Sequence, residues 1–332
     1  MPERLRETLR GRITSLGFVF NHDSLHDEIR IRYLYGILFS LCIFCVNITF
    51  MTKLVDGKKI AGEILQVQQK QVRTLNFVPR LAVIMVGENP ASNLYVKMKQ
   101  KRGDQAGIIV DIHRYTVEIS QAKLIEEIKK FNTQKDVHGI LVQLPLPASM
   151  NRQLVLDAVD PQIDVDCLTS HNKEFLIAGK VPFHNPPAPS AILEILDRYQ
   201  VDLKNSHILI VGTGDLIGEP LSAMLLHRKL AFELANRHTG NLTELAARAD
   251  VIITGVGKAG LITRDMIKQG AVIIDAGTTG SDDGGLVGDV DTDSVIGKAS
   301  LLAPVPGGVG PVTVAMLLKN VINSALYNNK EV

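Results

Sequence analysis

The chain has 332 residues, of which 45% are hydrophobic and 21% charged, and its 36 basic and 35 acidic residues leave a net charge of +1. This composition is that of a folded soluble protein, and the near-average Gly and Pro content and three cysteines exclude the collagenous, disordered and disulfide-rich classes. Balanced charge and 5% aromatic residues, none of them Trp, give no case for nucleic-acid binding. The length predicts about two domains.

The first 50 residues differ from the rest of the sequence. An arginine-rich stretch is followed by an uncharged run over residues 33–52, which is long enough to span a bilayer. At Met51 the sequence changes to that of an ordinary domain start, so we expect translation to begin there and residues 1–50 not to belong to the functional protein. The alternatives are a membrane anchor over residues 33–52 and a targeting peptide. Cys42 and Cys45 lie in the apolar run and are expected to pack rather than to form a redox pair.

Beyond Met51, short apolar strands alternate with amphipathic helices. The expected elements in the first half are a helix at 59–75, a strand at 81–86, a helix at 92–106, a strand at 108–110, a helix at 121–131 and a strand at 139–143. Continuous apolar strands separated by helices indicate parallel pairing in a sheet with both faces covered.

The second half repeats this alternation more strictly. Its expected strands are at 208–211, 230–234, 251–254, 271–275 and 301–303, with a helix at 242–249 capped by Thr239 or Asn241. A Pro-rich bend at 182–189 and the helix after it, ending near Tyr199, mark the domain boundary. The chain is therefore predicted to be an α/β protein of two α/β domains with a cleft between them, the second with a Rossmann-type parallel sheet.

A glycine-rich turn follows the strand at 208–211 and precedes an apolar helix. Gly212 permits a tight turn, Gly214 lets the backbone approach a pyrophosphate, and the helix N-terminus attracts its negative charge. Thr213 lies between these glycines, and Gly218 comes one residue later than in the usual spacing. The turn predicts a dinucleotide site, the alternative being a glycine-rich turn of any α/β protein.

The second Rossmann strand favours one nicotinamide cofactor over the other. A carboxylate at its tip binds the ribose 2′-hydroxyl of NAD, whereas a basic residue accommodates the 2′-phosphate of NADP. Here the tip carries Arg237, and Glu233 lies inside the strand and is expected to point elsewhere. We therefore predict NADP, with NAD less favoured; the alternative for Arg237 is a solvated loop cation.

A second candidate site lies in the first half. Tyr95 and Lys99 are four residues apart on an expected helix and so share one face. Gln143 is the polar residue at the end of an apolar strand, where open α/β sheets bind ligands. A lysine beside that strand end would lose part of its hydration, which favours its neutral form. Without such a partner, this lysine-rich helix would be read as a solvated basic face.

Four separated segments resemble the bifunctional methylenetetrahydrofolate dehydrogenase/methenyltetrahydrofolate cyclohydrolase family. They are residues 87–101, 139–147, 164–166 and 304–315, and the resemblance extends over essentially all of residues 51–332. It implies oxidation of 5,10-methylenetetrahydrofolate with NADP and hydrolysis of the methenyl product to 10-formyltetrahydrofolate, reactions of one-carbon metabolism. It also implies a metal-free, cytoplasmic homodimer.

The resemblance also implies roles for individual residues. Lys99 corresponds to the catalytic lysine, Tyr95 to the residue that orients the folate, Gln143 to the glutamine that tunes the lysine, and Asp166 to the acid that holds the pterin. The implied folate contacts further include Pro306, Gly307 and Gly308, and the implied cofactor contacts include Thr278.

The implied domains are a folate-binding catalytic domain, residues 51–195 with the C-terminal helix 313–332, and an NADP-binding Rossmann domain, residues 196–312.

The chain departs from the family pattern at several positions: Cys167 replaces a Gly, Gly214 replaces a Ser, and segments 186–191, 257–259 and 275–278 differ. Most departures surround the cofactor. These departures leave two alternatives: a cyclohydrolase with weakened or lost dehydrogenase activity, and a non-catalytic folate- or nucleotide-binding paralogue. A further alternative is a generic NAD(P)-linked dehydrogenase acting on amino acids or shikimate-like acids, which explains the fold and the glycine-rich turn but not the segments at 143–147 and 304–315.

Overall fold

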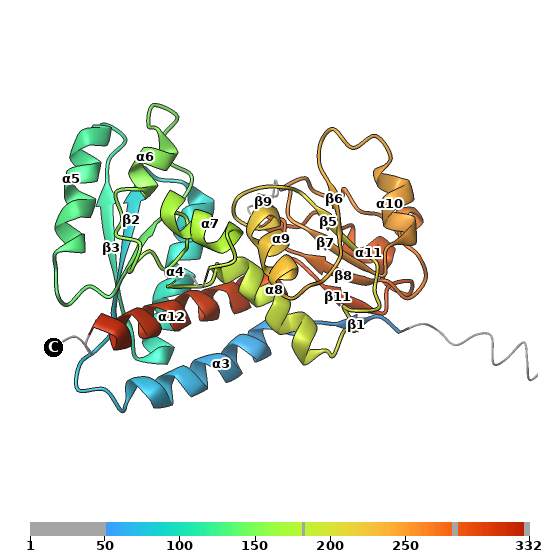
Figure 1. Cartoon of the computed structure of the whole chain (residues 1–332), viewed down its shortest axis with the longest axis horizontal. Coiled ribbons are helices and arrows are strands. Elements are labelled where there is room, and N and C mark those ends of the chain that lie inside the picture. The colour runs from blue at the N-terminus through green and yellow to red at the C-terminus, as the bar shows by residue number, and fades with distance from the viewer. Residues whose placement is uncertain (1–50, 181–182, 281–284, 329–332) are drawn as a thin grey trace, which may run out of the picture. The chain divides into compact units, whose positions relative to one another are not determined.

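The computed structural model describes residues 51–180, 183–280 and 285–328. The expected membrane anchor, up to residue 50, and the cysteine pair at 42 and 45 lie outside the described residues. The described chain contains two parallel sheets covered by helices, as the alternation of strands and helices predicts, so the expected α/β class is confirmed (Figure 1).

The first lobe is built on a three-stranded parallel sheet in the order β3-β2-β4. Strands β2 and β4 are almost entirely apolar and buried, whereas the edge strand β3 also carries Asp111, His113 and Arg114. Helices cover both faces of the sheet, since each face would otherwise expose apolar side chains. One face packs against α3, α4 and α12, and the other against α5 and α6. The bounds are β2 (Arg80–Val86), β3 (Ile109–Tyr115), β4 (Gly139–Val142), α3 (Gly57–Val72), α4 (Pro90–Ala106), α5 (Gln121–Asn132), α6 (Arg152–Leu156), α7 (Ser170–Ile177) and α12 (Val309–Asn328).

Helix α4 has sequence signals at both of its ends. Gly87 turns the chain after β2 with φ +74°, and the Asn89 side chain accepts a hydrogen bond from the Ser92 backbone N–H at 3.1 Å. Gly107 ends the helix in the left-handed conformation, with φ +77°. The helix therefore starts and stops where the sequence predicts, to within two residues.

The second lobe contains a six-stranded sheet in the order β1-β11-β8-β7-β5-β6, with every neighbouring pair parallel. Helices α8 and α9 pack on one face, and α10 and α11 on the other. The bounds are β1 (Lys53–Leu54), β5 (Ile208–Val211), β6 (Glu233–Ala235), β7 (Val251–Thr254), β8 (Val272–Asp275), β9 (Thr279–Gly280), β10 (Leu286–Val287), β11 (Leu301–Ala303), α8 (Pro187–Arg198), α9 (Gly218–His227), α10 (Leu242–Arg248), η1 (Arg264–Met266) and α11 (Thr292–Val295).

Both sheets have a topological switch point. In the second lobe the chain passes from β5 to β6 on one side and returns to β7 on the other, and in the first lobe β3 and β4 flank β2 in the same way. The loops that leave neighbouring strands in opposite directions open a crevice at the carboxyl ends, which is where such sheets bind ligands. Each lobe therefore offers one such position.

Helices α3 and α12 contribute to the cores of both lobes and run side by side (Figure 1). Val312 of α12 packs in the core of the second lobe, whereas Val321 packs in that of the first. Within the described ranges α12 is the one helix long and apolar enough to cross a membrane, and 72% of its apolar window is buried in the protein. Its apolar character is therefore explained by packing against both lobes.

Several details differ from the sequence expectations. Strand β3 extends over Ile109–Tyr115 rather than 108–110, and α3 ends at Val72 rather than at 75. Helix α12 begins at Val309 rather than at 313, because Pro311 is tolerated in a first helical turn. Strand β6 is Glu233–Ala235 rather than 230–234. Strand β1 pairs with β11 in the second sheet, although we expected residues 51–195 to belong to the first domain. A two-residue strand has no periodicity, so tertiary pairing alone determines where it lies.

Candidate active site

A lysine and a glutamine meet at the carboxyl edge of the three-stranded sheet. Lys99 lies on α4, and its Nζ donates a hydrogen bond of 2.7 Å to Oε1 of Gln143. Gln143 directly follows β4, and its backbone N–H donates to the carbonyl of Ile84 in β2. The pair therefore lies at the switch point of this sheet.

A neighbouring carbonyl sets the orientation of the Gln143 amide. Gln143 Nε2 donates to the carbonyl oxygen of Leu144 at 2.8 Å, and Ser92 Oγ, from the first turn of α4, donates to the same oxygen at 3.2 Å. With its NH2 group bound to this carbonyl, the amide presents its oxygen to Lys99. Both a neutral amine and an ammonium group can donate to that oxygen, so Lys99 keeps this partner in either protonation state.

Two aspartates in the loop between α6 and α7 have different roles. Asp164 forms a parallel bridge with Ile140 of β4, and its buried carboxylate accepts a hydrogen bond of 2.8 Å from the Thr169 backbone N–H. These contacts fold the loop against the sheet. Asp166 follows two residues later and lies close enough to Lys99 for each charge to influence the other.

The environments of Lys99 and Asp166 oppose their ionisation. Burial lowers the pKa of Lys99 from its ordinary value, and the negative charge of Asp166 partly offsets that effect. Burial raises the pKa of Asp166 to about 6, against the positive charge of Lys99, while nearby Asp164 adds to the rise. Lys99 therefore has a larger neutral fraction at a given pH than a solvated lysine, which favours a role as a proton acceptor.

Cys167 stands beside Asp166 in a conformation that favours glycine. Its φ is +60°, in the left-handed region, and its side chain is buried. Burial, together with the charges of Asp164 and Asp166, raises the pKa of the thiol well above its ordinary value. Cys167 therefore stays protonated, and the departure from Gly noted in the sequence introduces backbone strain rather than a nucleophile.

Tyr95 extends toward the second lobe. It lies one helical turn before Lys99 on α4, and its Oη donates a hydrogen bond of 3.3 Å to Oγ1 of Thr278, which precedes β9. The structure therefore brings Tyr95 together with the expected cofactor residue Thr278, and links the lobes beside the lysine.

The glycine-rich turn after β5 has two positions that exclude larger residues. Gly212 has φ +108°, and a Cβ there would lie 2.9 Å from the Gly255 carbonyl oxygen. A Cβ on Gly218 would lie 2.0 Å from the carbonyl oxygen of Gly212. By contrast, Gly214 faces open space and Thr213 is exposed. The turn thus packs tightly against the β7 loop at the switch point and leaves its tip accessible, as a pyrophosphate site requires.

Arg237 lies two residues beyond β6 and is exposed, with its Nε donating to Nε2 of His238 at 3.2 Å. Glu233, in contrast, binds Arg248 at 2.8 Å and approaches His207 at 3.2 Å. The carboxylate in the strand therefore has its partners away from the tip, as expected. The tip itself presents a guanidinium group, which suits a phosphate better than a ribose hydroxyl.

Two buried aspartates organise the other loops at this edge of the second sheet. Asp289 accepts hydrogen bonds from the Val256 backbone N–H at 2.7 Å, and Asp275 accepts from the N–H groups of Gly277 and Asp289 at 3.0 and 3.1 Å. Burial raises the pKa of Asp275 to about 6, although these N–H donors lower it. The two carboxylates join the loops after β7 and β8, next to Thr278.

Pro306, Gly307 and Gly308 connect β11 to α12. The carbonyl of Gly307 accepts from the Gly57 backbone N–H at 2.9 Å, and a Cβ on Gly57 would lie 1.8 Å from the Gly308 carbonyl oxygen. Gly57, the first residue of α3, therefore permits this loop to pack closely against the start of that helix. Among the described residues, the loop forms no hydrogen bond with the Lys99 cluster.

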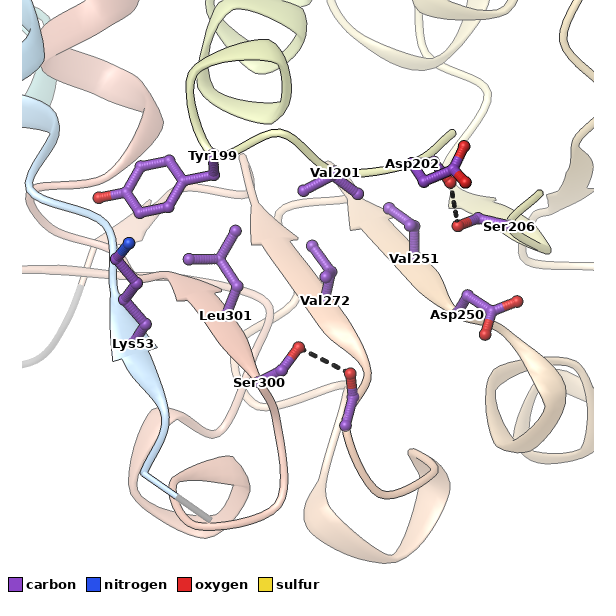
Figure 2. Close-up of a pocket in the computed structure, with 11 residues that line it drawn as sticks. Lys53, Tyr199, Val201, Asp202, Ser206, Asp250, Val251, Val272, Ser300 and Leu301 are labelled. Carbon is purple, nitrogen blue, oxygen red and sulfur yellow. Dashed lines mark hydrogen bonds between the residues drawn. The ribbon is translucent and has the colours of Figure 1, made fainter. Parts of the chain in front are cut away.

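A cavity of about 420 Å³ opens at the opposite edge of the second sheet (Figure 2). It is lined by the first residues of four strands, and the Lys53 ammonium lies 4.7 Å from the centre of the Tyr199 ring. Because the strands are parallel, this amino edge lies away from the glycine-rich turn. In the ranges that the structure describes, no group of three or more His, Cys, Asp and Glu side chains is arranged to hold a metal ion.

Sequence reasoning missed several supporting residues. Asp164 stands in the same Asp-Val-Asp motif as Asp166, and its spacing could have suggested a structural partner. Ser92 acts through a backbone carbonyl, which no sequence pattern reveals. Asp215, in the glycine-rich turn, binds Arg152 and Lys173 of the first lobe. Its partners lie far away in the sequence, so no local signal identifies them.

Comparison with known families gives two matches, which follow one another along the chain. Residues 55–166 match the catalytic domain of tetrahydrofolate dehydrogenase/cyclohydrolase, and residues 186–329 match its NAD(P)-binding domain. The chain is 41% identical over 282 residues to the bifunctional protein FolD of Nautilia profundicola, which covers 84% of this chain and 99% of that relative.

Two solved structures show the same architecture. The FolD methylenetetrahydrofolate dehydrogenase/cyclohydrolase of Campylobacter jejuni is 36% identical, with a TM-score of 0.80 over 83% of this chain and 99% of that chain. The Trypanosoma brucei enzyme, solved with NADP and an inhibitor, is 30% identical, with a TM-score of 0.80 over 84% of this chain and 99% of that chain.

Proposed function

The chain belongs to the tetrahydrofolate dehydrogenase/cyclohydrolase family, and we propose that Lys99, Gln143, Asp166 and Tyr95 form its active site. It oxidises 5,10-methylenetetrahydrofolate to the 5,10-methenyl cation with NADP⁺, and it hydrolyses that cation to 10-formyltetrahydrofolate. The observation that carries this assignment is the 2.7 Å hydrogen bond between Lys99 and Gln143, in a site where burial lowers the pKa of the lysine.

Hydrolysis uses Lys99 as the group that moves protons. The methenyl carbon is already cationic, so the reaction needs a positioned water and a base. Neutral Lys99 takes a proton from the attacking water as the C–O bond forms, and the resulting ammonium can protonate the ring nitrogen as the C–N bond breaks. The hydroxyl proton is lost as the formyl carbonyl forms, so one proton is released overall. Gln143 keeps the Lys99 amine in place throughout, because its amide oxygen accepts in both protonation states.

Asp166 and Tyr95 bind the folate. The Asp166 carboxylate, when ionised, can accept two hydrogen bonds from the amino group and ring N–H of the pterin. Tyr95 presents an aromatic ring from the same helix as Lys99, on which the folate can stack. Pro306, Gly307 and Gly308 remain proposed folate contacts on the strength of the family resemblance alone.

The second lobe fits NADP. Bound NADP⁺ supplies the hydride acceptor for the methylene group. Gly212, Thr213, Gly214 and Gly218 form the turn that receives the pyrophosphate, because a Cβ at the first or last position would collide with backbone. Arg237 binds the 2′-phosphate, which favours NADP over NAD.

Thr278 is proposed to align the nicotinamide from the loop after β8, since its hydroxyl already accepts from Tyr95. Hydride transfer then takes place between the two lobes.

We keep the proposed division into a folate-binding domain (51–195 with 313–332) and a Rossmann domain (196–312), although β1 pairs in the second sheet and α12 packs in the cores of both lobes. A homodimer is proposed through β6, the last strand in the order of the second sheet, where Leu234 is 46% exposed. We propose the cytoplasm as its compartment, where reduced folates and NADP are available.

Absorbance spectroscopy on the full chain tests both activities. Methenyltetrahydrofolate has its own chromophore, so its accelerated loss reports the cyclohydrolase, and the appearance of reduced cofactor reports the dehydrogenase. We expect both, with NADP⁺ favoured over NAD⁺. A protein that accelerates neither reaction contradicts the proposal.

A further inference from the structure

An ion cluster joins the glycine-rich turn to the first lobe. Asp215 lies within that turn, between Gly214 and Gly218. Its Oδ2 is 2.7 Å from Nη1 of Arg152, on α6, and 3.2 Å from Nζ of Lys173, on α7. One carboxylate of the cofactor loop therefore binds two cations from two helices of the other lobe.

The side chains of the cluster are partly shielded from solvent, which strengthens their ion pairs. The side chains of Asp215, Arg152 and Lys173 are 29%, 39% and 19% exposed, respectively. Lys173 also donates to Oε1 of Gln153 at 3.1 Å, which orients its ammonium group. Burial alone would raise the pKa of Asp215, but the Arg152 hydrogen bond and charge, followed by those of Lys173, hold it below its ordinary value. Partly buried, multiply bonded pairs are screened less than exposed ones.

The cluster connects the proposed cofactor site with the surroundings of the proposed folate site. The turn that carries Asp215 is the proposed pyrophosphate site, whereas the charge of Arg152 lowers the pKa of Asp166, the proposed pterin acid. The lobes are also joined by the apolar packing of α3 and α12, by the contact of α7 with α9, and by the hydrogen bond from Tyr95 to Thr278. The ion cluster is thus a polar connection on the ligand-binding side of the molecule.

The two proposed reactions depend differently on this connection. Hydrolysis uses Lys99, Gln143 and Asp166, all of which belong to the first lobe. Hydride transfer needs the folate in the first lobe and the nicotinamide in the second to be held at reacting distance, and small displacements are costly.

We propose that Asp215, Arg152 and Lys173 are positioning residues for hydride transfer, which hold the glycine-rich turn against α6 and α7 so that cofactor and folate meet in a productive geometry. The inference rests on the proposed function and adds residues that act on one of its two reactions. Breaking the cluster is expected to separate the dehydrogenase from the cyclohydrolase.

Asp215→Asn is the primary test, because it removes the charge with little change in shape and leaves Arg152 beside Asp166. We expect the dehydrogenase kcat to fall by about tenfold while the cyclohydrolase kcat stays unchanged. The matched control is Glu126→Gln on α5. Glu126 also binds two cations, Lys123 at 3.0 Å and Lys130 at 2.9 Å, but both lie on its own helix. The control should preserve both activities.

A double-mutant cycle with Arg152→Gln checks that the residues act together. Once Asp215 is neutral, Arg152→Gln should reduce the dehydrogenase kcat by much less than it does in the wild-type chain. Hydrogen exchange gives a readout independent of turnover: the amides of residues 212–218 should exchange faster in Asp215→Asn than in the control.

The outcomes distinguish this inference from the proposed function. Equal loss of both activities in Asp215→Asn, or a rise in the cofactor KM with unchanged kcat, would overturn the positioning role. A wild-type chain without either activity would overturn the proposed function and this inference together. Selective loss of the dehydrogenase, with non-additivity in the cycle, supports both.

Discussion

The folate side and the cofactor side of the site are built by different means. On the folate side, Lys99 and Asp166 are partly buried, and burial shifts both of their pKa values. On the cofactor side, Thr213 and Arg237 are exposed, and shape is provided by glycines and by backbone N–H groups bound to buried aspartates. The first arrangement changes the pKa values of side chains, whereas the second forms an accessible surface that a ligand can contact.

This difference predicts how substitutions on each side should behave. Desolvation and a fixed partner give Lys99 its reactivity, so changes there should act on rates. Exposed charges and tight turns provide affinity and selectivity, so changes at Arg237 should act on cofactor preference. Each experiment below tests one side of that contrast, beginning with the largest expected effect.

Lys99→Met should lower the cyclohydrolase kcat by about 10³-fold, because it removes the group that accepts the proton from water. Methionine at this partly buried position should leave thermal stability unchanged or higher, since no charge must be desolvated. Both are measured by absorbance assay and thermal unfolding. Lys101→Met, at an exposed position on the same helix, is the control and should retain activity. Substantial turnover by the Lys99 variant would remove this residue from the mechanism.

Asp166→Asn should raise the folate KM by roughly 10- to 100-fold, the loss expected for hydrogen bonds to a charged group. In the wild-type chain, KM should rise as the pH falls through about 6, because the carboxylate becomes protonated. The Asn variant should show no such rise in a KM-against-pH profile. Parallel profiles for the two proteins contradict the role of Asp166 in holding the pterin.

Protonation of Asp166 should have opposite effects on folate binding and on the stability of the fold. The pKa of Asp166 is raised on folding, so the native state binds more protons than the unfolded chain between about pH 4 and 6. Acid therefore weakens folate binding at this residue while its protonation favours the fold. Across this pH range, the free energy of unfolding should fall less steeply with rising pH in Asp166→Asn than in the wild type.

Arg237→Ala should reduce the preference for NADP⁺ over NAD⁺ by about tenfold, through loss of a charged contact with the 2′-phosphate. The ratio of kcat/KM for the two cofactors measures it. His238→Ala, a change in the neighbouring residue of the same loop, should alter the ratio much less. An unchanged ratio in the Arg237 variant refutes its assignment to the phosphate.

The smallest expected effect comes from backbone strain at Cys167, next to the proposed pterin acid Asp166. Alanine is normally favoured over glycine, but at φ +60° we expect Cys167→Gly to be more stable than Cys167→Ala by about 1 kcal/mol. Comparing these two variants removes the loss of the buried sulfur from the result, since both lack it. Denaturant unfolding gives the difference, and a more stable Ala variant would show that the strain is negligible.

Much of the fold could be predicted from the sequence because its signals are local. The strand at 81–86 and the helix at 121–131 agree with the structure to within one residue, since apolar periodicity and side-chain caps act over a few residues. Gly212 and Gly218 were also identifiable, because their conformations and close contacts belong to one turn. Family resemblance, rather than periodicity, identified Asp166 and supplied the folate chemistry.

What the sequence alone determined is thus the α/β class, the two parallel units, the glycine-rich turn and the family. Tertiary structure decided that Asp164 folds the loop carrying Asp166, that β1 joins the second sheet, and that Asp215 binds cations of the other lobe. These contacts join residues far apart in the chain, and their energies depend on burial, which local patterns do not encode. Side-chain environment, more than residue type, therefore distinguishes Lys99 from the exposed lysines on the same helix.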